Sequence, residues 1–324
     1  MNRTAPGTAA SSPSVRTSGL LLWAALGTVY LLWGSTYVGM RAVVETIPPF
    51  FGAGLRFLLA GVLLGAILVP RRGWSALRSS PQELAGAAVI GVLLLMGGNG
   101  LLMVGEQYVP AGFASLLFAA VPLWVALFRT ATRDRPALAT LAGVLVGFAG
   151  LAALLLPGSH GGDTNLGGAV TILVASLCWA TGSFLSPRLP MPRDPFVSSA
   201  YEMTIGGAAT LVLGLGIGEL HGAGPASFSV GSWIGLGYLV VFGSVIAFTA
   251  FVWLLANAPI SLVATYAYVN PVVAVALGAL ILGETVTAVV LLGGTIVLAG
   301  VALVVSTERR KAPVDSTVRS PRPR

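Results

Sequence analysis

Charged side chains are the scarcest class in this sequence. Only 9% of its 324 residues are Asp, Glu, Lys or Arg, whereas soluble domains carry roughly 25%. Hydrophobic residues make up 56%, and the mean hydropathy is +0.89. A water-soluble core cannot hide this much apolar surface, so the composition excludes an ordinary soluble domain and indicates an integral membrane protein.

Cysteine, histidine and lysine are almost absent, and each absence excludes a kind of chemistry. The single cysteine, Cys178, excludes a disulfide framework and a cysteine metal cluster. His160 and His221 fall in predicted loops, and no His or Asp pair has metal-ligand spacing within the apolar runs. The only lysine is Lys311, and the sequence contains neither a phosphate-binding loop nor a nucleophile elbow. We therefore predict no metal, no cofactor, no ATP-driven pumping and no enzymatic activity.

What the sequence does contain is ten apolar runs, and about 20 apolar residues cross a bilayer as a helix. The predicted fold is an all-α integral membrane protein with ten transmembrane helices. The first run is too long for a signal-peptide core, so we take it as a span. The ten runs are Leu20–Val38, Phe51–Val69, Leu84–Val104, Ala111–Phe128, Leu138–Leu156, Ala169–Leu185, Phe196–Gly216, Trp233–Leu255, Ile260–Leu282 and Val286–Val305.

The basic residues fall on alternate sides of these spans. With the N-terminus in the cytoplasm, all of the 18 except Arg41 and Arg56 lie in inside segments. This distribution predicts a multi-pass protein of the cytoplasmic (inner) membrane with both termini cytoplasmic. It also explains the net charge of +7 without a nucleic-acid partner. The partners we expect are the lipid bilayer and a small-molecule substrate, for a monomer or a homodimer.

The second half of the sequence repeats the first. "LLWGSTYVG" from Leu31 aligns with "LCWATGSFL" from Leu177, and "PAGFASLLFAAVP" from Pro110 aligns with "PISLVATYAYVNP" from Pro259. A unit of five spans leaves the membrane on the side opposite its entry, so the second copy must be inverted. Inverted repeats are typical of carriers whose two halves give alternating access to a central site.

This repeat predicts the domain organisation. We expect a disordered cytoplasmic N-terminus over residues 1–18 and a first five-helix repeat over 19–157. An inter-repeat loop over 158–168 leads to the second repeat, 169–305. A disordered basic tail, 306–324, follows it.

Polar and aromatic residues recur at corresponding places in the two copies. Polar side chains are costly in lipid unless they face a cavity or a partner helix. Alternatively, Trp33 and Tyr37 belong to an interfacial aromatic belt, and Asn99 makes an interhelical hydrogen bond. The residues predicted to line a central substrate cavity are Trp33, Ser35, Tyr37, Asn99, Trp179, Ser183, Tyr266, Tyr268 and Asn270.

Pro122 and Pro271 also correspond, since each follows an earlier proline by twelve residues. Proline cannot donate a hydrogen bond to the carbonyl four residues earlier, here that of Phe118 or Ala267. We predict a helix kink at each proline. Around Pro271 the freed carbonyl and its polar neighbours would contact the substrate, or the kink is purely structural.

Arg56, Glu106 and Glu202 are the residues predicted to act in coupling or gating. A charge at the bilayer centre costs about 2.5–3.5 kcal/mol, so none of the three should face lipid without a partner. We expect Arg56 to form an ion pair with Glu106, with Glu45 as the rival acid.

Glu202 has three possible states in this scheme. It would pair with Arg188 or Arg129 near the cytoplasmic side, or stand free as a proton acceptor that couples proton entry to substrate exit. A static ion pair or hydrogen bond is the alternative to a coupling role.

Together these features resemble the drug/metabolite transporter superfamily, and within it the ten-span EamA-type exporters. The motifs that carry the resemblance are "WGSTYVGMR" from Trp33, "AGFASLLFAAVPLWVAL" from Ala111 and "NPVVAVALGALILGE" from Asn270. The second copy departs from the pattern at Ala180, where the first has glycine.

The resemblance implies a cavity built mainly from the first, third, fourth, sixth, eighth and ninth spans. It also implies export of a small metabolite, amino-acid-like or drug-like, by alternating access. An importer or exchanger of the same fold stays open, as does a membrane-embedded sensor or accessory subunit without a transport path.

Overall fold

The computed structural model describes residues 19–132, 137–156, 165–222, 224–258 and 260–311, and every regular element among them is a helix. The predicted disordered segment 1–18, most of the basic tail and of the inter-repeat loop, and His160 lie outside these residues. The helices are α1 (Gly19–Val44), α2 (Pro49–Arg72), η1 (Trp74–Leu77), α3 (Pro81–Gly91), η2 (Val92–Gly100), α4 (Leu101–Glu106), α5 (Ala111–Phe118), α6 (Val121–Thr130), α7 (Leu138–Leu154), α8 (Leu166–Leu185), η3 (Ser186–Arg188), α9 (Pro195–Gly216), η4 (Pro225–Ser227), α10 (Val230–Tyr238), η5 (Leu239–Ile246), α11 (Ala247–Asn257), α12 (Ile260–Val263), α13 (Tyr266–Leu282) and α14 (Ala288–Lys311).

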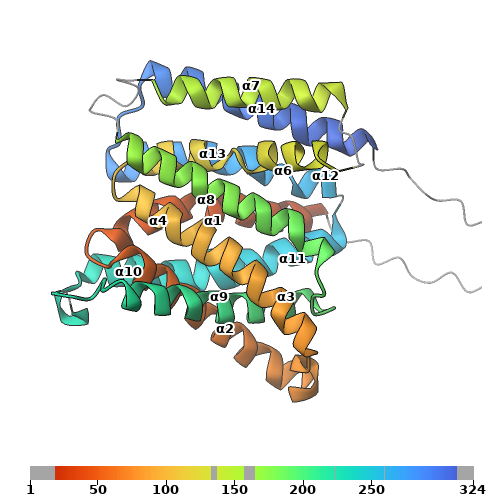
Figure 1. The fold of residues 1–324 in the computed structure, drawn as a ribbon, viewed down its shortest axis with the longest axis vertical. Helices are drawn as coiled ribbons and strands as arrows, with labels where there is room; N and C mark the ends of the chain where they lie inside the picture. Colours follow the sequence, from red (N-terminus) through yellow and green to blue (C-terminus); the bar gives the residue numbers. More distant parts are fainter. Residues whose placement is uncertain (1–18, 133–136, 157–164, 223, 259, 312–324) are drawn as a thin grey trace, which may run out of the picture.

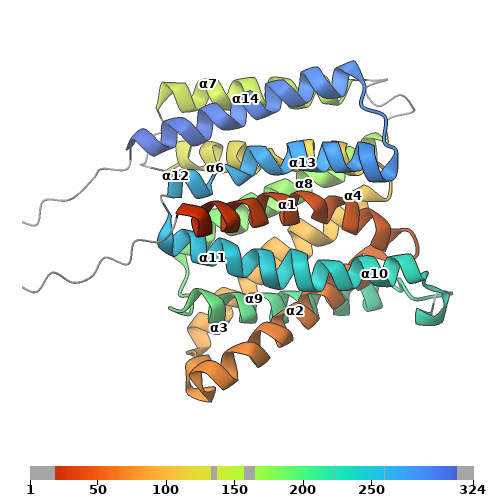
Figure 2. The same cartoon turned by 180° about the vertical axis from the view of Figure 1, so that it is seen from behind.

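Eight helical segments of the described chain are long and apolar enough to cross a bilayer, and two shorter apolar helices, α7 and α13, accompany them. This composition fits the predicted integral membrane protein. The helices run side by side, and α1 begins at the same end of the bundle as α14 ends (Figures 1 and 2). We call this end the near end, and the end where α1 meets α2 the far end.

Two helix pairs form the opposite edges of the bundle. Helix α2 packs along α9 at one edge, and α7 packs along α14 at the other (Figure 1). Glycine residues allow the helix backbones to come into close contact in both pairs. A methyl group added at Gly207 would come within 2.8 Å of the Phe57 carbonyl carbon, and one at Gly150 within 2.6 Å of the Val297 nitrogen. Such small residues are how membrane helices reach close contact.

Two long helical segments change to a π-helix part of the way along. Between α3 and α4 lies η2, and between α10 and α11 lies η5. They start at residues 92 and 239, which are 147 residues apart. A π turn widens the helix and frees backbone groups, and such turns are frequent at functional sites.

The predicted proline kinks take a different form in the structure. The segment around Pro122 is broken at Ala119 and Ala120, so that this proline lies in the first turn of α6. A proline there loses no hydrogen bond, because the first helical N–H groups have no acceptor. Pro271 lies inside α13, and the corresponding break falls before it, at Ala264 and Thr265.

Candidate functional site

Trp33 lies in an aromatic cluster that joins α1 to two later helices. Its ring centroid is 4.9 Å from that of Phe251 in α11 and 5.2 Å from that of Tyr266 in α13. Its indole N–H donates to the backbone carbonyl of Gly243 in η5, at 3.2 Å. The π-helix thus supplies an acceptor for the indole, and a partly polar, aromatic surface forms between α1, η5, α11 and α13.

Ser35 and Tyr37 lie on the same helix and face different neighbours. The Ser35 hydroxyl is 2.5 Å from the phenol oxygen of Tyr238 and also donates to the Leu32 carbonyl. Tyr37 is partly buried and packs against the main apolar core. The polar run of α1 therefore contacts other helices.

Tyr268 also packs against that core, and Asn270 is almost completely buried. The side-chain oxygen of Asn270 has no hydrogen-bond partner. A methyl group added at Gly34 of α1 would come within 3.1 Å of the Asn270 carbonyl oxygen. The amide oxygen is therefore an uncommitted acceptor near a close contact between α1 and α13.

The counterparts in η2 and α8 form a separate group. Trp179 packs against Phe118 with ring centroids 5.9 Å apart, and it covers Gly98 of η2. Asn99 donates weakly to the Leu94 carbonyl of its own π-helix, at 3.4 Å, so this bond is not between helices. Ser183 is exposed. The two tryptophans of the repeat thus lie in different aromatic clusters.

The predicted ion pair between Arg56 and Glu106 is not formed in the structure. Arg56 is buried, donates from Nε to the Ser244 hydroxyl at 3.0 Å, and stacks on Phe57 with 4.5 Å from Cζ to the ring centroid. Its Nη1 and both carboxyl oxygens of Glu106 are buried without hydrogen-bond partners. The Ser244 hydroxyl of η5 is thus the partner of Arg56, in place of the predicted Glu106 carboxylate. The rival acid, Glu45, is exposed at the far end.

Glu202 accepts a hydrogen bond from the Ser198 hydroxyl one turn earlier in α9, at 2.7 Å. Arg188, one of its predicted partners, instead donates to the Phe184 carbonyl and stacks on that ring. The expected pairing with Arg188 is therefore wrong, because the arginine folds back on its own segment.

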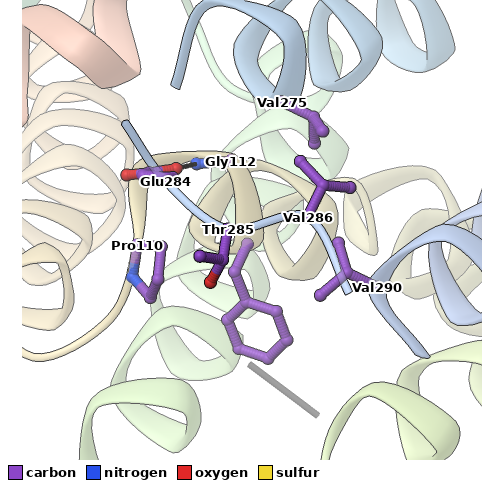
Figure 3. Close-up of a pocket in the computed structure, with 8 residues that line it drawn as sticks. Pro110, Gly112, Val275, Glu284, Thr285, Val286 and Val290 are labelled. Carbon is purple, nitrogen blue, oxygen red and sulfur yellow. Dashed lines mark hydrogen bonds between the residues drawn. The ribbon is translucent and has the colours of Figure 1, made fainter. Parts of the chain in front are cut away.

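Two acidic residues that are not among the predicted site residues each hold the start of a helix. Glu284, which follows α13, accepts hydrogen bonds from the backbone N–H groups of Ala111 (2.6 Å) and Gly112 (2.9 Å). Figure 3 shows this carboxylate against the start of α5. A proline precedes α5 and offers no capping oxygen, so a distant carboxylate satisfies the free N–H groups.

Glu219 repeats the arrangement at the start of α2. It accepts from the backbone N–H groups of Phe50 (3.0 Å) and Phe51 (2.6 Å), where Pro48 again precedes the helix without a side-chain cap. A carboxylate is also favoured there by the helix dipole. The signal in the sequence is a proline at a helix start with no Ser, Thr, Asp or Asn before it.

Two pockets meet at Glu284 and Pro110 at the far end. The larger has a volume of about 350 Å³ and is lined by Arg41, Glu45, Gln107 and Tyr108 as well. The smaller is narrow and mainly apolar, with Val275, Val286 and Val290 opposite the carboxylate (Figure 3). Neither pocket includes any of the nine residues predicted to line a cavity.

Comparison with known proteins places this geometry in a family. The model of the EamA-like transporter family matches the chain twice, over residues 19–156 and 166–306. An uncharacterized inner membrane transporter of Escherichia coli (strain K12), YedA, is 39% identical over 88% of this chain and 90% of its own length. An uncharacterized transporter of Synechocystis, sll0355, is 28% identical over 87% of this chain and 89% of its own length.

A solved crystal structure shares the fold, with a TM-score of 0.62 and 20% sequence identity, over 89% of this chain and 98% of that one. The resemblance read from the sequence motifs is therefore confirmed, and so is a multi-pass transporter of the inner membrane. The chain belongs to the EamA-like transporter family.

Proposed function

We propose that this transporter is a secondary carrier that exports a small metabolite, amino-acid-like or drug-like, from the cytoplasm by alternating access. The double match of the family model carries the proposal, because the two matches start at residues 19 and 166, 147 residues apart. The two π-helices have the same separation. An internal duplication of an odd number of spans gives inverted halves, which suit rocking about a central site. In this scheme the near end is cytoplasmic.

The substrate site of the proposal lies where α1 meets α13 and the π-helix η5. Aromatic faces at Trp33 and Tyr266 can stack on an apolar or cationic part of the solute. The uncommitted oxygen of Asn270 can accept a hydrogen bond from a solute N–H or O–H. The other predicted lining residues are retained in this proposal, with Ser183 as its outermost member.

Energy for export would come from an ion gradient, such as that of protons. Arg56, Glu106 and Glu202 are the proposed coupling or gating groups, since each is an ionisable side chain inside the helix bundle. Glu202→Gln tests one of them, because loss of gradient-driven flux supports a coupling role and unchanged flux removes Glu202 from the mechanism.

Export is tested in proteoliposomes loaded with a pool of labelled metabolites under an imposed pH gradient. We expect at least one metabolite to leave faster than from loaded vesicles that lack the protein. Trp33→Ala should slow its release. Trp23→Ala is the matched control, because Trp23 lies on the same helix and is 62% exposed. If nothing leaves faster than from the vesicles that lack the protein, the transport proposal fails and a sensor role gains. If the vesicles instead take up labelled metabolites that are added outside, an importer is favoured.

A further inference from the structure

Glu106 is the most deeply buried ionisable side chain whose burial the structure gives. It ends α4 at the far end, its exposed fraction is 0%, and neither carboxyl oxygen has a hydrogen-bond donor. An ionised carboxylate in such a place costs several kcal/mol unless a partner compensates it. The unpartnered oxygens therefore indicate a neutral carboxyl group in this arrangement of the helices.

Two guanidinium groups lie within electrostatic range of Glu106, and neither bonds its carboxyl group. From α1, Arg41 donates to the backbone carbonyl of Glu106, and from α2, Arg56 is held by Ser244. The carboxylate of Glu284 is also within electrostatic range of Glu106 and is hydrogen-bonded to the start of α5. The other elements packed against α4, namely α5, α8 and η2, contain no acidic or basic residue.

Nη1 of Arg56 lacks a hydrogen-bond acceptor, which an ionised Glu106 could supply. The exposed fraction of Arg56 is 4%, and its Nη1 has no acceptor although Nε is bonded to Ser244. Glu106 is the acidic group that acts on it electrostatically. The two side chains are thus an unformed pair: a cation with a free donor, and an acid whose two oxygens accept nothing.

Glu106 directly precedes two residues that line a pocket, and it is electrostatically linked to the proposed substrate site. The two residues that follow it, Gln107 and Tyr108, line the pocket of about 350 Å³ at the far end. On its other side, the Tyr37 phenol of α1 is within electrostatic range of the carboxyl group. A proton on Glu106 therefore has a short route to water and an influence on the polar run of α1.

We propose that Glu106 is the group that binds and releases the coupling proton, with Arg56 as its counter-charge. On release the carboxyl O–H bond breaks, the proton passes to a water molecule that reaches the carboxyl group when the carrier is open to the cytoplasm, and the electron pair stays on the carboxylate. The carboxylate then accepts a hydrogen bond from Nη1 of Arg56. Protonation from the far-end pocket, which is on the outer side in the proposed orientation, separates the pair and restores the arrangement described above.

Infrared difference spectra of the full chain in lipid, taken between acidic and alkaline buffer, test the proton site directly. The wild type should show a carboxyl C=O stretching band that disappears in alkaline buffer. Glu106→Gln should remove this band, whereas Glu202→Gln, which removes a partly buried carboxyl group of α9, should leave it. Glu106→Asp should restore a band at a different frequency, which shows that the fold and the site survive substitution. Loss of the counter-charge in Arg56→Gln should make the band persist to more alkaline buffer.

Two results overturn the proposal: a band that is unchanged in Glu106→Gln, or a wild type that shows no protonated carboxyl band at any pH. The role of this proton in driving export rests on the proposed function, but its binding does not. If proteoliposomes transport nothing and Glu106→Gln still removes the band, the proposed function fails and the proton site stands. If a solute is exported and Glu106→Gln leaves gradient-driven flux unchanged, the coupling role fails.

Discussion

The two edges of the bundle use the same packing and differ in what they carry. Both α2–α9 and α7–α14 are closed by glycines that bring backbones into contact. The α2–α9 pair also carries the buried Arg56 and the partly buried Glu202. In contrast, α7 has no charged residue, and its polar link to α14 is a hydroxyl pair between Thr140 and Thr307, at 2.9 Å.

Ionisable groups are costly in lipid and are kept where they serve a function. We therefore call the α7–α14 pair the structural edge and the α2–α9 pair the working edge. The α7–α14 pair needs shape alone, whereas α2–α9 adds ionisable groups inside the bundle and acidic caps at both ends. Substitutions that alter shape should harm both edges, and substitutions that alter charge or polarity should affect transport at one edge only.

The largest loss of stability is expected where backbones touch. Gly207→Ala in α9 and Gly150→Ala in α7 should each lower the free energy of unfolding by about 1–3 kcal/mol, because the added methyl group meets backbone atoms. Gly65→Ala in α2 is the control, since nothing lies within 4 Å of its added methyl group. It should stabilise slightly through higher helix propensity. Thermal melting in detergent measures all three, and equal melting temperatures for Gly207→Ala and Gly65→Ala would contradict the packing account.

Next in size is the cap that closes the far end of the working edge. Glu219→Gln keeps the shape and removes the charge that accepts from two N–H groups at the start of α2. We expect a loss of about 1–2 kcal/mol. Glu45→Gln, at an exposed acid of the same end, should change the melting temperature much less. A smaller effect of Glu219→Gln than of Glu45→Gln would show that the cap does not stabilise the helix start.

Much of the fold follows from hydropathy, because lipid demands long apolar helices. The first predicted span, Leu20–Val38, became α1 over Gly19–Val44, and the second, Phe51–Val69, became α2 over Pro49–Arg72. The interruptions were not predictable in the same way. A π turn and an α turn have the same hydropathy, so η2 and η5 leave no trace in an apolar run. The break before Pro271, at Ala264 and Thr265, likewise falls among residues that do not mark a helix boundary.

The sequence singled out polar residues within the spans, but it did not predict which side chains they contact. Polar residues within a span stand out because burying them in lipid costs free energy, and for this reason Trp33 and Arg56 could be singled out from the sequence. Their contacts depend on which helix lies opposite, and a single sequence does not contain that information. Ser244 of η5 is 188 residues from Arg56, and Glu219 is 168 residues from Phe51. The ion pair of Arg56 with Glu106 was inferred only from their similar depth in the membrane. In the structure the Arg56 side chain bonds Ser244 instead.

A smaller effect is expected at the structural edge, where it tests whether that edge takes part in transport. Thr307→Val removes the hydroxyl bonded to Thr140 and should cost about 0.5–1.5 kcal/mol. Export of the solute identified in proteoliposomes should keep its wild-type rate. Thr295→Val is the matched control on α14, because its exposed hydroxyl bonds only to the carbonyl of Leu291 in its own helix. A change in export rate with Thr307→Val would remove the distinction between the two edges.

The smallest effect is expected at the near end of the working edge, where Arg72 pairs with Asp194. Both side chains are well exposed, at 41% and 36%, so the pair should contribute about 0–1 kcal/mol and less at high salt. Asp194 also accepts from the backbone N–H groups of Phe196 and Val197 at the start of α9. Asp194→Asn should therefore destabilise more than Arg72→Gln, because it weakens a helix cap as well as the ion pair. Melting at low and high salt separates the two terms, and a larger loss for Arg72→Gln would mean that the ion pair rather than the cap holds α9 to α2.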